Sequence, residues 1–246
     1  MPKIYRERVA DVLIEGYNFE MGDYLSEGFE IYKKEWLMFS LYGLVSIFLL
    51  FISAITIVGI LFTAYPIMLG YAVAADKVSR SENLEFSDFF GGFKNFGSHA
   101  MVTILIVAAY LIVYIPFLGS IFMSGLNGGG DDLYYNLIGA FGSLYVMIGV
   151  LFIYFLMLGF FFAPYLIHYG NYSGGEAIRA SFKIVFKNFW WLLLFLIITG
   201  ILGAVGQYAC LIGLIFTLPI SALMNYSLVK KVLMSDDAHE IDQIGE

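Results

Sequence analysis

The positive charges of this chain fall into four clusters that are separated by long apolar stretches. The thirteen Lys and Arg residues are Lys3, Arg6, Arg8, Lys33, Lys34, Lys77, Arg80, Lys94, Arg179, Lys183, Lys187, Lys230 and Lys231. None of them lies in the ranges 35–76, 95–178 and 188–229. Lys and Arg collect on the cytoplasmic side of a membrane because they resist translocation. Each apolar stretch therefore begins and ends on the cytoplasmic side, which predicts two spanning helices in each.

Composition supports lipid as the solvent. Of the 246 residues, 60% are hydrophobic and only 13% are charged, more apolar surface than one water-soluble core can hide. The predicted fold is an all-α integral membrane protein with about six spanning helices, paired as three repeated helical hairpins, and with both termini cytoplasmic. The hairpins are expected at 36–76, 98–165 and 190–229, with their spans at 36–55, 58–76, 98–117, 137–165, 190–208 and 211–229.

The hairpins define one domain with two flanking segments. We expect a cytoplasmic N-terminal segment at 1–21, the membrane domain at 22–231 and an acidic cytoplasmic tail at 232–246. The outer turns are short except for 117–136, where the Gly-rich stretch 124–132 disfavours helix and strand. Asp131 and Asp132 leave open whether this loop is simply solvated or binds a cation.

A short motif recurs at the outer tip of each predicted hairpin. It reads aliphatic, Gly, any residue, Ile or Leu, Phe, and then Thr or Met, and its Gly and Phe positions are Gly59, Phe62, Gly119, Phe122, Gly213 and Phe216. Pro66 and Pro219 follow it at matching places in the first and third copies. Three copies of one hairpin unit are the simplest explanation. Matching prolines either shape the bundle or break helices at a transport site.

The segments that enter the hairpins also correspond. Before the first hairpin an apolar stripe with helical spacing is formed by Leu25, Phe29, Tyr32 and Trp36, and before the third by Ile178, Phe182, Val185 and Phe189. Before the second hairpin the stripe is shorter, at Phe86, Phe89, Phe90 and Phe93. One-sided apolar helices of this kind are expected to lie flat at the membrane interface before the chain turns inward.

Several segments resemble a known group of proteins. They are Lys187-Asn188-Phe189-Trp190, Gly213-Leu214-Ile215-Phe216-Thr217, Pro219, Ala163-Pro164-Tyr165-Leu166 and Gly174-Gly175-Glu176-Ala177 with Ser181. Together they resemble a family of uncharacterised bacterial multi-pass membrane proteins that is related to the membrane domain of some glycerophosphodiester phosphodiesterases. The resemblance covers about 22–231 and implies the bacterial inner (plasma) membrane, but it carries no catalytic residue.

Candidate residues for chemistry are few. The six predicted spans hold no charged residue in their cores, whereas driven transporters and proton relays place such residues there. The remaining polar candidates are His99, His168 and Asn225, and the two histidines lie near cytoplasmic span ends where they could meet. We expect no catalytic constellation, no cofactor and no metal site, and Cys210 has no cysteine partner.

These observations favour a non-enzymatic scaffold or accessory subunit of a membrane complex. Its expected partners are the lipid bilayer and either another protein or a second copy of the chain within the membrane, and not nucleic acid. The alternative is a transporter or channel for a lipid or small amphiphile. A membrane-embedded enzyme that uses His99 and His168 ranks third.

Overall fold

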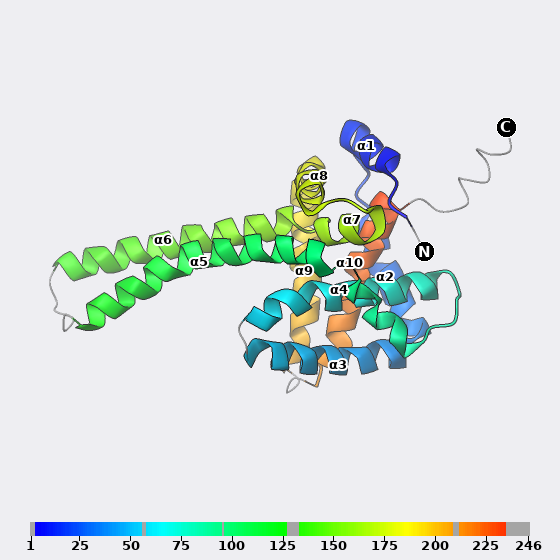
Figure 1. Ribbon diagram of the computed structural model, residues 1–246, viewed down its shortest axis with the longest axis horizontal. Helices are drawn as coiled ribbons and strands as arrows, with labels where there is room; N and C mark the ends of the chain where they lie inside the picture. The colour runs from blue at the N-terminus through cyan, green and yellow to red at the C-terminus, as the bar shows by residue number, and fades with distance from the viewer. Residues whose placement is uncertain (1–2, 56–57, 95, 127–132, 209–211, 235–246) are drawn as a thin grey trace.

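The computed structural model describes residues 3–55, 58–94, 96–126, 133–208 and 212–234. Within these ranges all secondary-structure elements are helical, which confirms the all-α prediction for this part of the chain (Figure 1). In chain order they are α1 (Arg6–Glu15), α2 (Met21–Lys34), α3 (Trp36–Ile55), α4 (Val58–Ser79), η1 (Phe86–Phe93), α5 (Phe96–Leu126), α6 (Leu133–Gly159), α7 (Ala163–Gly170), α8 (Gly174–Lys187), α9 (Phe189–Val205), η2 (Gly206–Tyr208) and α10 (Leu214–Leu233). The acidic tail beyond 234, the loop residues 127–132 and Cys210 lie outside the described residues.

Among the described residues, four helical stretches are long and apolar enough to cross a membrane, which indicates a membrane-embedded protein. They are Trp36–Ile55, His99–Pro116, Met147–Gly170 and Phe189–Tyr208. In three of them only 28% of the window is buried inside the protein, so most of their apolar side chains face outward. Outward-facing apolar side chains are stable only in lipid or against a partner.

Two expected spans, 58–76 and 211–229, are not among these four stretches of the described residues, which exclude residue 211 and the side chains of 58, 60 and 61. The helices at these places, α4 and α10, are less apolar than α3 and α9. Helix α10 contacts α2, α3, α4 and α9, and ten of its twenty residues are buried. A helix that other helices surround does not need a uniformly apolar surface, which explains its lower hydropathy.

The second hairpin departs from its predicted boundaries. The span predicted at 98–117 was expected to end there, but helix α5 continues to Leu126 and so includes Gly125 of the expected Gly-rich loop. One glycine costs a helix only about 1 kcal/mol, which the long apolar helix before it outweighs. The predicted span 137–165 is also interrupted, because α6 ends at Gly159 and α7 begins at Ala163 with Pro164 in its first turn. Proline is favoured at a helix start, where its missing N–H is not needed.

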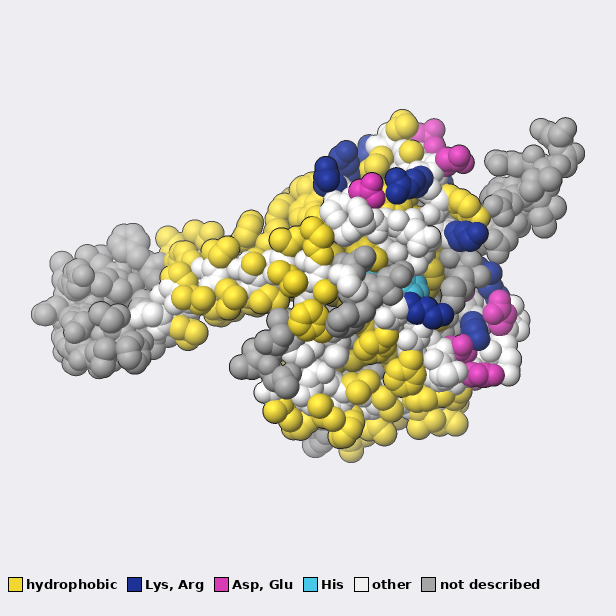
Figure 2. Space-filling view, in the orientation of Figure 1, with side chains coloured by type: hydrophobic (Ala, Val, Ile, Leu, Met, Phe, Trp, Pro, Cys, Tyr) yellow, Lys and Arg dark blue, Asp and Glu magenta, His cyan; other side chains and the backbone are white. Residues whose placement is uncertain are grey.

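The α5–α6 hairpin projects from the other helices (Figure 1). Its two helices contact each other along the projection, and Gly149 allows a close approach to Val113. On the face shown in Figure 2, hydrophobic side chains cover the described part of this hairpin and α3. Charged side chains gather instead over the body of the molecule, around α1 and α8 and at the end away from the hairpin tip.

Helices α2 and α8 have the same local geometry. Both contain fourteen residues, and both bury their fourth, eighth, eleventh and twelfth positions, which are Tyr24, Gly28, Ile31 and Tyr32 in α2 and Ala177, Ser181, Ile184 and Val185 in α8. Their C-caps also agree, with φ −134° and ψ 41° at Glu35 and φ −138° and ψ 44° at Asn188. From the predicted stripes, Tyr32 and Val185 are buried, whereas Phe29 and Trp36 are 43% and 53% exposed. Phe29 therefore lies on the exposed face of α2, and the flat position of this helix at a membrane interface stays a prediction.

Helix α2 packs directly onto the backbone of α10. A β-carbon on Gly28 would lie 2.6 Å from the Cα atom of Met224, so only glycine fits at this crossing. In the same helix, Gly22 has no atom within 4 Å of the place where its β-carbon would stand. The two glycines therefore form a matched pair for testing the crossing.

We predict that Gly28→Ala destabilises the protein, because the added methyl group forces α2 away from α10. Overpacking of this kind costs about 1–3 kcal/mol, whereas Gly22→Ala is expected to be neutral or to stabilise α2 by up to about 1 kcal/mol. Thermal unfolding of the two purified variants in the same detergent measures the difference. Equal midpoints for both variants would show that α2 does not pack against α10 as described.

Candidate functional site

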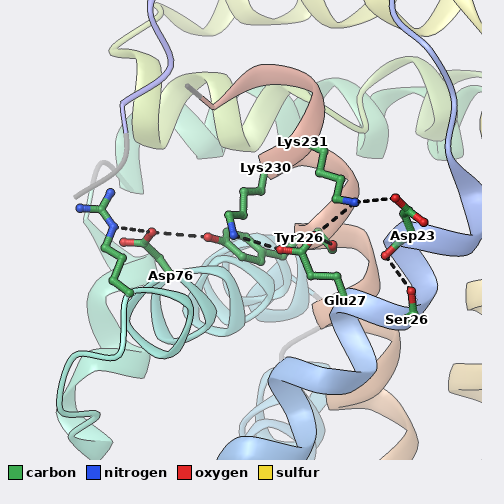
Figure 3. A network of polar contacts seen from close by, with 9 residues as sticks. Asp23, Ser26, Glu27, Asp76, Tyr226, Lys230 and Lys231 are labelled. Atoms are coloured by element: carbon green, nitrogen blue, oxygen red, sulfur yellow. Dashed lines mark hydrogen bonds and ion pairs between the residues drawn. The ribbon is translucent and has the colours of Figure 1, made fainter. Parts of the chain in front are cut away.

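The most buried carboxylate in the described part of the chain is that of Asp76, near the C-terminal end of α4. Asp76 is 7% exposed, and its Oδ1 accepts hydrogen bonds from Nε of Arg80 at 3.2 Å and from the hydroxyl of Tyr226 at 3.4 Å. Arg80 lies one turn further along the chain, whereas Tyr226 comes from α10 (Figure 3). Asp76 therefore links α4 to α10. An isolated carboxylate would be costly in this place, and the Arg80 guanidinium compensates it.

A second polar group joins α2 to the end of α10 (Figure 3). Glu27 accepts hydrogen bonds from the hydroxyl of Ser227 at 2.7 Å and from Nζ of Lys230 at 3.0 Å. One turn earlier, Asp23 accepts a hydrogen bond from Nζ of Lys231 at 3.0 Å. Partial burial alone would lower the pKa of Lys231, but the Asp23 and Glu27 carboxylates outweigh burial and raise this pKa.

A pocket lies between α4 and η1, beside Asp76. Its volume is about 260 Å³, and it is lined by Val73, Asp76, Lys77, Glu82, Ser87, Asp88, Phe90, Gly91 and Lys94. Nζ of Lys77 lies 2.7 Å from Oδ1 of Asp88, and Oδ2 of Asp88 accepts a hydrogen bond from the backbone N–H of Glu85. The hydrogen bond to Asp88 raises the pKa of Lys77 against a smaller lowering by burial.

Glycines bring η1 close enough to α4 to form this pocket. A β-carbon on Gly92 would lie 2.1 Å from the carbonyl oxygen of Pro66, and one on Gly70 would lie 2.2 Å from the carbonyl oxygen of Phe89. The Phe89 ring is fully buried and stacks on Tyr42 of α3 with 4.3 Å between ring centroids. This fixed aromatic contact holds η1 across the end of the first hairpin.

The two histidines singled out from the sequence lie next to each other. The rings of His99 in α5 and His168 in α7 are 6.4 Å apart between centroids and are nearly parallel, at 26°. His99 is 2% exposed, and neither of its ring nitrogens hydrogen-bonds to a described residue. No group of three or more His, Cys, Asp or Glu side chains suited to a metal ion is present among the described residues. The structure thus brings together the two histidines that the sequence predicted could meet.

Asn225 and its polar neighbours join α9 to α10. Oδ1 of Asn225 accepts a hydrogen bond from the Thr199 hydroxyl at 3.3 Å, and Ser221 donates to the Thr199 carbonyl at 2.8 Å. Thr217 donates to the carbonyl of Gly203 at 2.8 Å. These groups satisfy one another across a helix pair, the usual role of small polar residues in membrane helices.

The repeat positions differ in their surroundings. Gly213 touches the place where a β-carbon on Gly206 would stand, Phe216 is 41% exposed, and Gly119 is open, with no atom within 4 Å of its β-carbon position. Gly59 and Phe62 lie in the first two turns of α4. The side chain of Phe122 is outside the described residues.

The two matching prolines lie where another segment presents a glycine. Pro219 packs against Gly43 of α3, whose β-carbon would meet the carbonyl oxygen of Ile215 at 2.5 Å, and the carbonyl of Pro66 faces Gly92. Both prolines thus lie at close helix crossings. The charged residues that line the pocket described above are ones that the sequence patterns had not brought together.

Comparison with known proteins gives no relative: no family model, no curated protein and no solved structure matches this chain.

We predict that Glu27→Gln weakens the α2–α10 contact, because the neutral amide loses the charge that pairs with Lys230. Since Glu27 is partly exposed, the expected cost in unfolding free energy is about 1 kcal/mol. Glu30→Gln is the control, because among the described residues Glu30 pairs with Lys33 of its own helix on the exposed face, and its cost should stay below about 0.5 kcal/mol. Chemical unfolding in detergent measures both values. A loss for Glu30→Gln as large as that for Glu27→Gln would contradict a special role for the α2–α10 ion pairs.

Proposed function

We propose that this protein is a non-enzymatic polytopic membrane protein that serves as a scaffold or accessory subunit of a membrane complex. The observation that carries the proposal is the α5–α6 hairpin, which projects from the body and exposes apolar side chains such as Ile112, Leu118 and Leu151. Helix α5 has 31 residues and is about 46 Å long at 1.5 Å per residue. It thus exceeds the hydrocarbon core of about 30 Å and offers a partner more surface than a simple span needs.

The polar groups of the bundle agree with a structural role. Thr199, Ser221 and Asn225 bond to neighbouring helices. The carboxylates of Asp23 and Glu27 are paired with lysines of α10. Side chains used in this way hold helices together and are not free for turnover of a substrate.

We further propose the bacterial inner membrane, three hairpins with six spans, and both termini on the cytoplasmic side. The equal geometry of α2 and α8 supports a repeated unit. The order of contacts supports it too. The three units begin with α2, η1 and α8, and the last helix of each unit packs on the first helix of the next: α4 on η1, α6 and α7 on α8, and α10 on α2. A cyclic order of this kind is expected of three related units.

Single-cysteine labelling tests this topology. In a Cys210→Ser background, cysteines at 34, 77, 179 and 230 should all react with a membrane-impermeant maleimide only after the cytoplasmic side is opened, because the Lys and Arg clusters stay there. A cysteine at 128, in the expected outer loop, should react in intact cells. Labelling of position 77 or 179 from outside would disprove the three-hairpin topology.

Photo-crosslinking in cells tests the scaffold function. A photoreactive residue at Leu118 of the projecting hairpin should give a discrete protein adduct, identified by mass spectrometry. The same residue at Phe48 of α3 is the control, because the two side chains are about equally exposed, at 60% and 62%. Adducts with lipid alone at both positions would count against a partner at the hairpin.

The second candidate is a transporter or channel for a lipid or small amphiphile. One observation favours it, the charged pocket between α4 and η1 with Phe90 at its edge. The two prolines do not add support, because each faces a glycine of a neighbouring segment. Crosslinks to a defined protein partner at Leu118 would favour the scaffold over the transporter.

A further inference from the structure

The pocket between α4 and η1 is lined by more charged residues than those in the ion pairs described above. Lys77 is paired with Asp88, and Asp76 is paired with Arg80. Glu82 and Lys94 also line the pocket, and neither forms an ion pair with another described residue. Among the described residues, one negative and one positive side chain of the lining thus lie outside its close ion pairs, although Glu82 also contributes to the raised pKa of Lys77.

The pocket combines this charge pattern with an apolar edge. Phe90 lines the pocket and is 42% exposed, whereas its neighbour Phe89 is buried in the core. A volume of about 260 Å³ lies just below the usual range for ligand pockets, about 300–1,000 Å³. It therefore suits a small polar group better than a whole lipid.

We propose that this pocket binds the phosphoethanolamine headgroup of a phospholipid, with the ammonium group at Glu82, the phosphate at Lys94 and the acyl chains leaving past Phe90. A primary ammonium group has three N–H donors for carboxylate oxygens, whereas a quaternary ammonium has none and favours aromatic cages. A headgroup that has a phosphate but no ammonium group would leave the negative charge of Glu82 without a counter-charge, close to the negative phosphate. The site therefore selects ethanolamine over both choline and glycerol headgroups.

This site places a lipid contact at the junction of the first and second hairpins. Because η1 closes over α4 through Gly92, an occupant between Glu82 and Lys94 would brace η1 against α4. The placement in the cytoplasmic leaflet rests on the proposed topology, since Lys77 and Lys94 belong to the cytoplasmic clusters. The binding chemistry itself does not depend on that topology.

Lipid binding by the full chain in detergent tests the proposal. Native mass spectrometry of the delipidated protein, titrated separately with dioleoyl phosphatidylethanolamine, phosphatidylcholine and phosphatidylglycerol, should show at least about five-fold tighter binding of phosphatidylethanolamine, the scale of one partly exposed ion pair. Equal affinity for the three lipids would overturn the proposal.

Three variants locate the site. Glu82→Gln should weaken the binding of phosphatidylethanolamine about five-fold and should leave the affinity for phosphatidylglycerol unchanged or higher. Lys94→Gln should lower the affinity for both lipids. Lys183→Gln removes an exposed lysine of α8 away from the pocket and should change neither. Glu82 and Lys94 are exposed, so the variants should keep the wild-type unfolding temperature. Retention of the ethanolamine preference in Glu82→Gln would disprove the assignment.

Competition identifies the source of the headgroup. Glycerophosphoethanolamine has the same charged groups without acyl chains, so it should compete only weakly if Phe90 guides the chains of a lipid. If glycerophosphoethanolamine competes as strongly as the lipid, the pocket recognises phosphoethanolamine, but the proposal that its occupant is a lipid is disproved. Because these measurements are made in detergent, they remain valid if cysteine labelling disproves the topology, and they do not depend on the hairpin crosslinks.

Discussion

The contact between α2 and α10 is the constraint on which the rest of the bundle depends. It joins residues 200 positions apart, such as Glu27 and Ser227, and so brings helices from near the two ends of the chain together. Gly28 lets the two backbones approach, and the pairs from Glu27 to Lys230 and from Asp23 to Lys231 hold them in place. Around α10, fixed in this way, α3, α4 and α9 assemble. The buried polar contact between Asp76 and Tyr226 forms on the same helix.

The same packing rule recurs through the bundle. Gly43 meets the helix of Pro219, Gly92 meets the carbonyl of Pro66, and Gly206 meets Gly213. In lipid, apolar side chains gain little by leaving the solvent, so helices associate through close packing and hydrogen bonds. Glycines and small polar residues are therefore specific contacts of this structure, beside a buried core that includes Phe39, Phe195 and Leu166. The α5–α6 hairpin makes few such contacts beyond its base, which is why it is the surface proposed for a partner.

Much of the helical structure could be predicted because it depends on local pattern. The apolar stretches and their length predicted helices at 36–55 and 190–208, and the structure has α3 and α9 at these places. The predicted end of the third span at 117 was wrong, because α5 continues to Leu126 and a single glycine such as Gly125 does not end a long apolar helix. The span 137–165 was also wrong as one helix. Ser181 of α8 stabilises the break after Gly159, since its hydroxyl bonds to the carbonyl of Gly159 and accepts the N–H of Phe162. A contact from twenty positions away leaves no trace in the local pattern.

By itself the sequence determined the helical content, the apolar character that requires lipid, and the clusters of positive charge that predict one cytoplasmic side. These follow from side-chain type and spacing along the chain, so no neighbour has to be known. Only the tertiary structure decided which glycine faces which backbone, that His99 lies beside His168, and that Glu82 and Lys94 border one pocket. Such pairings depend on distances through space between residues of different elements. Many arrangements of the same helices satisfy the same apolar pattern, and close packing with paired charges selects among them.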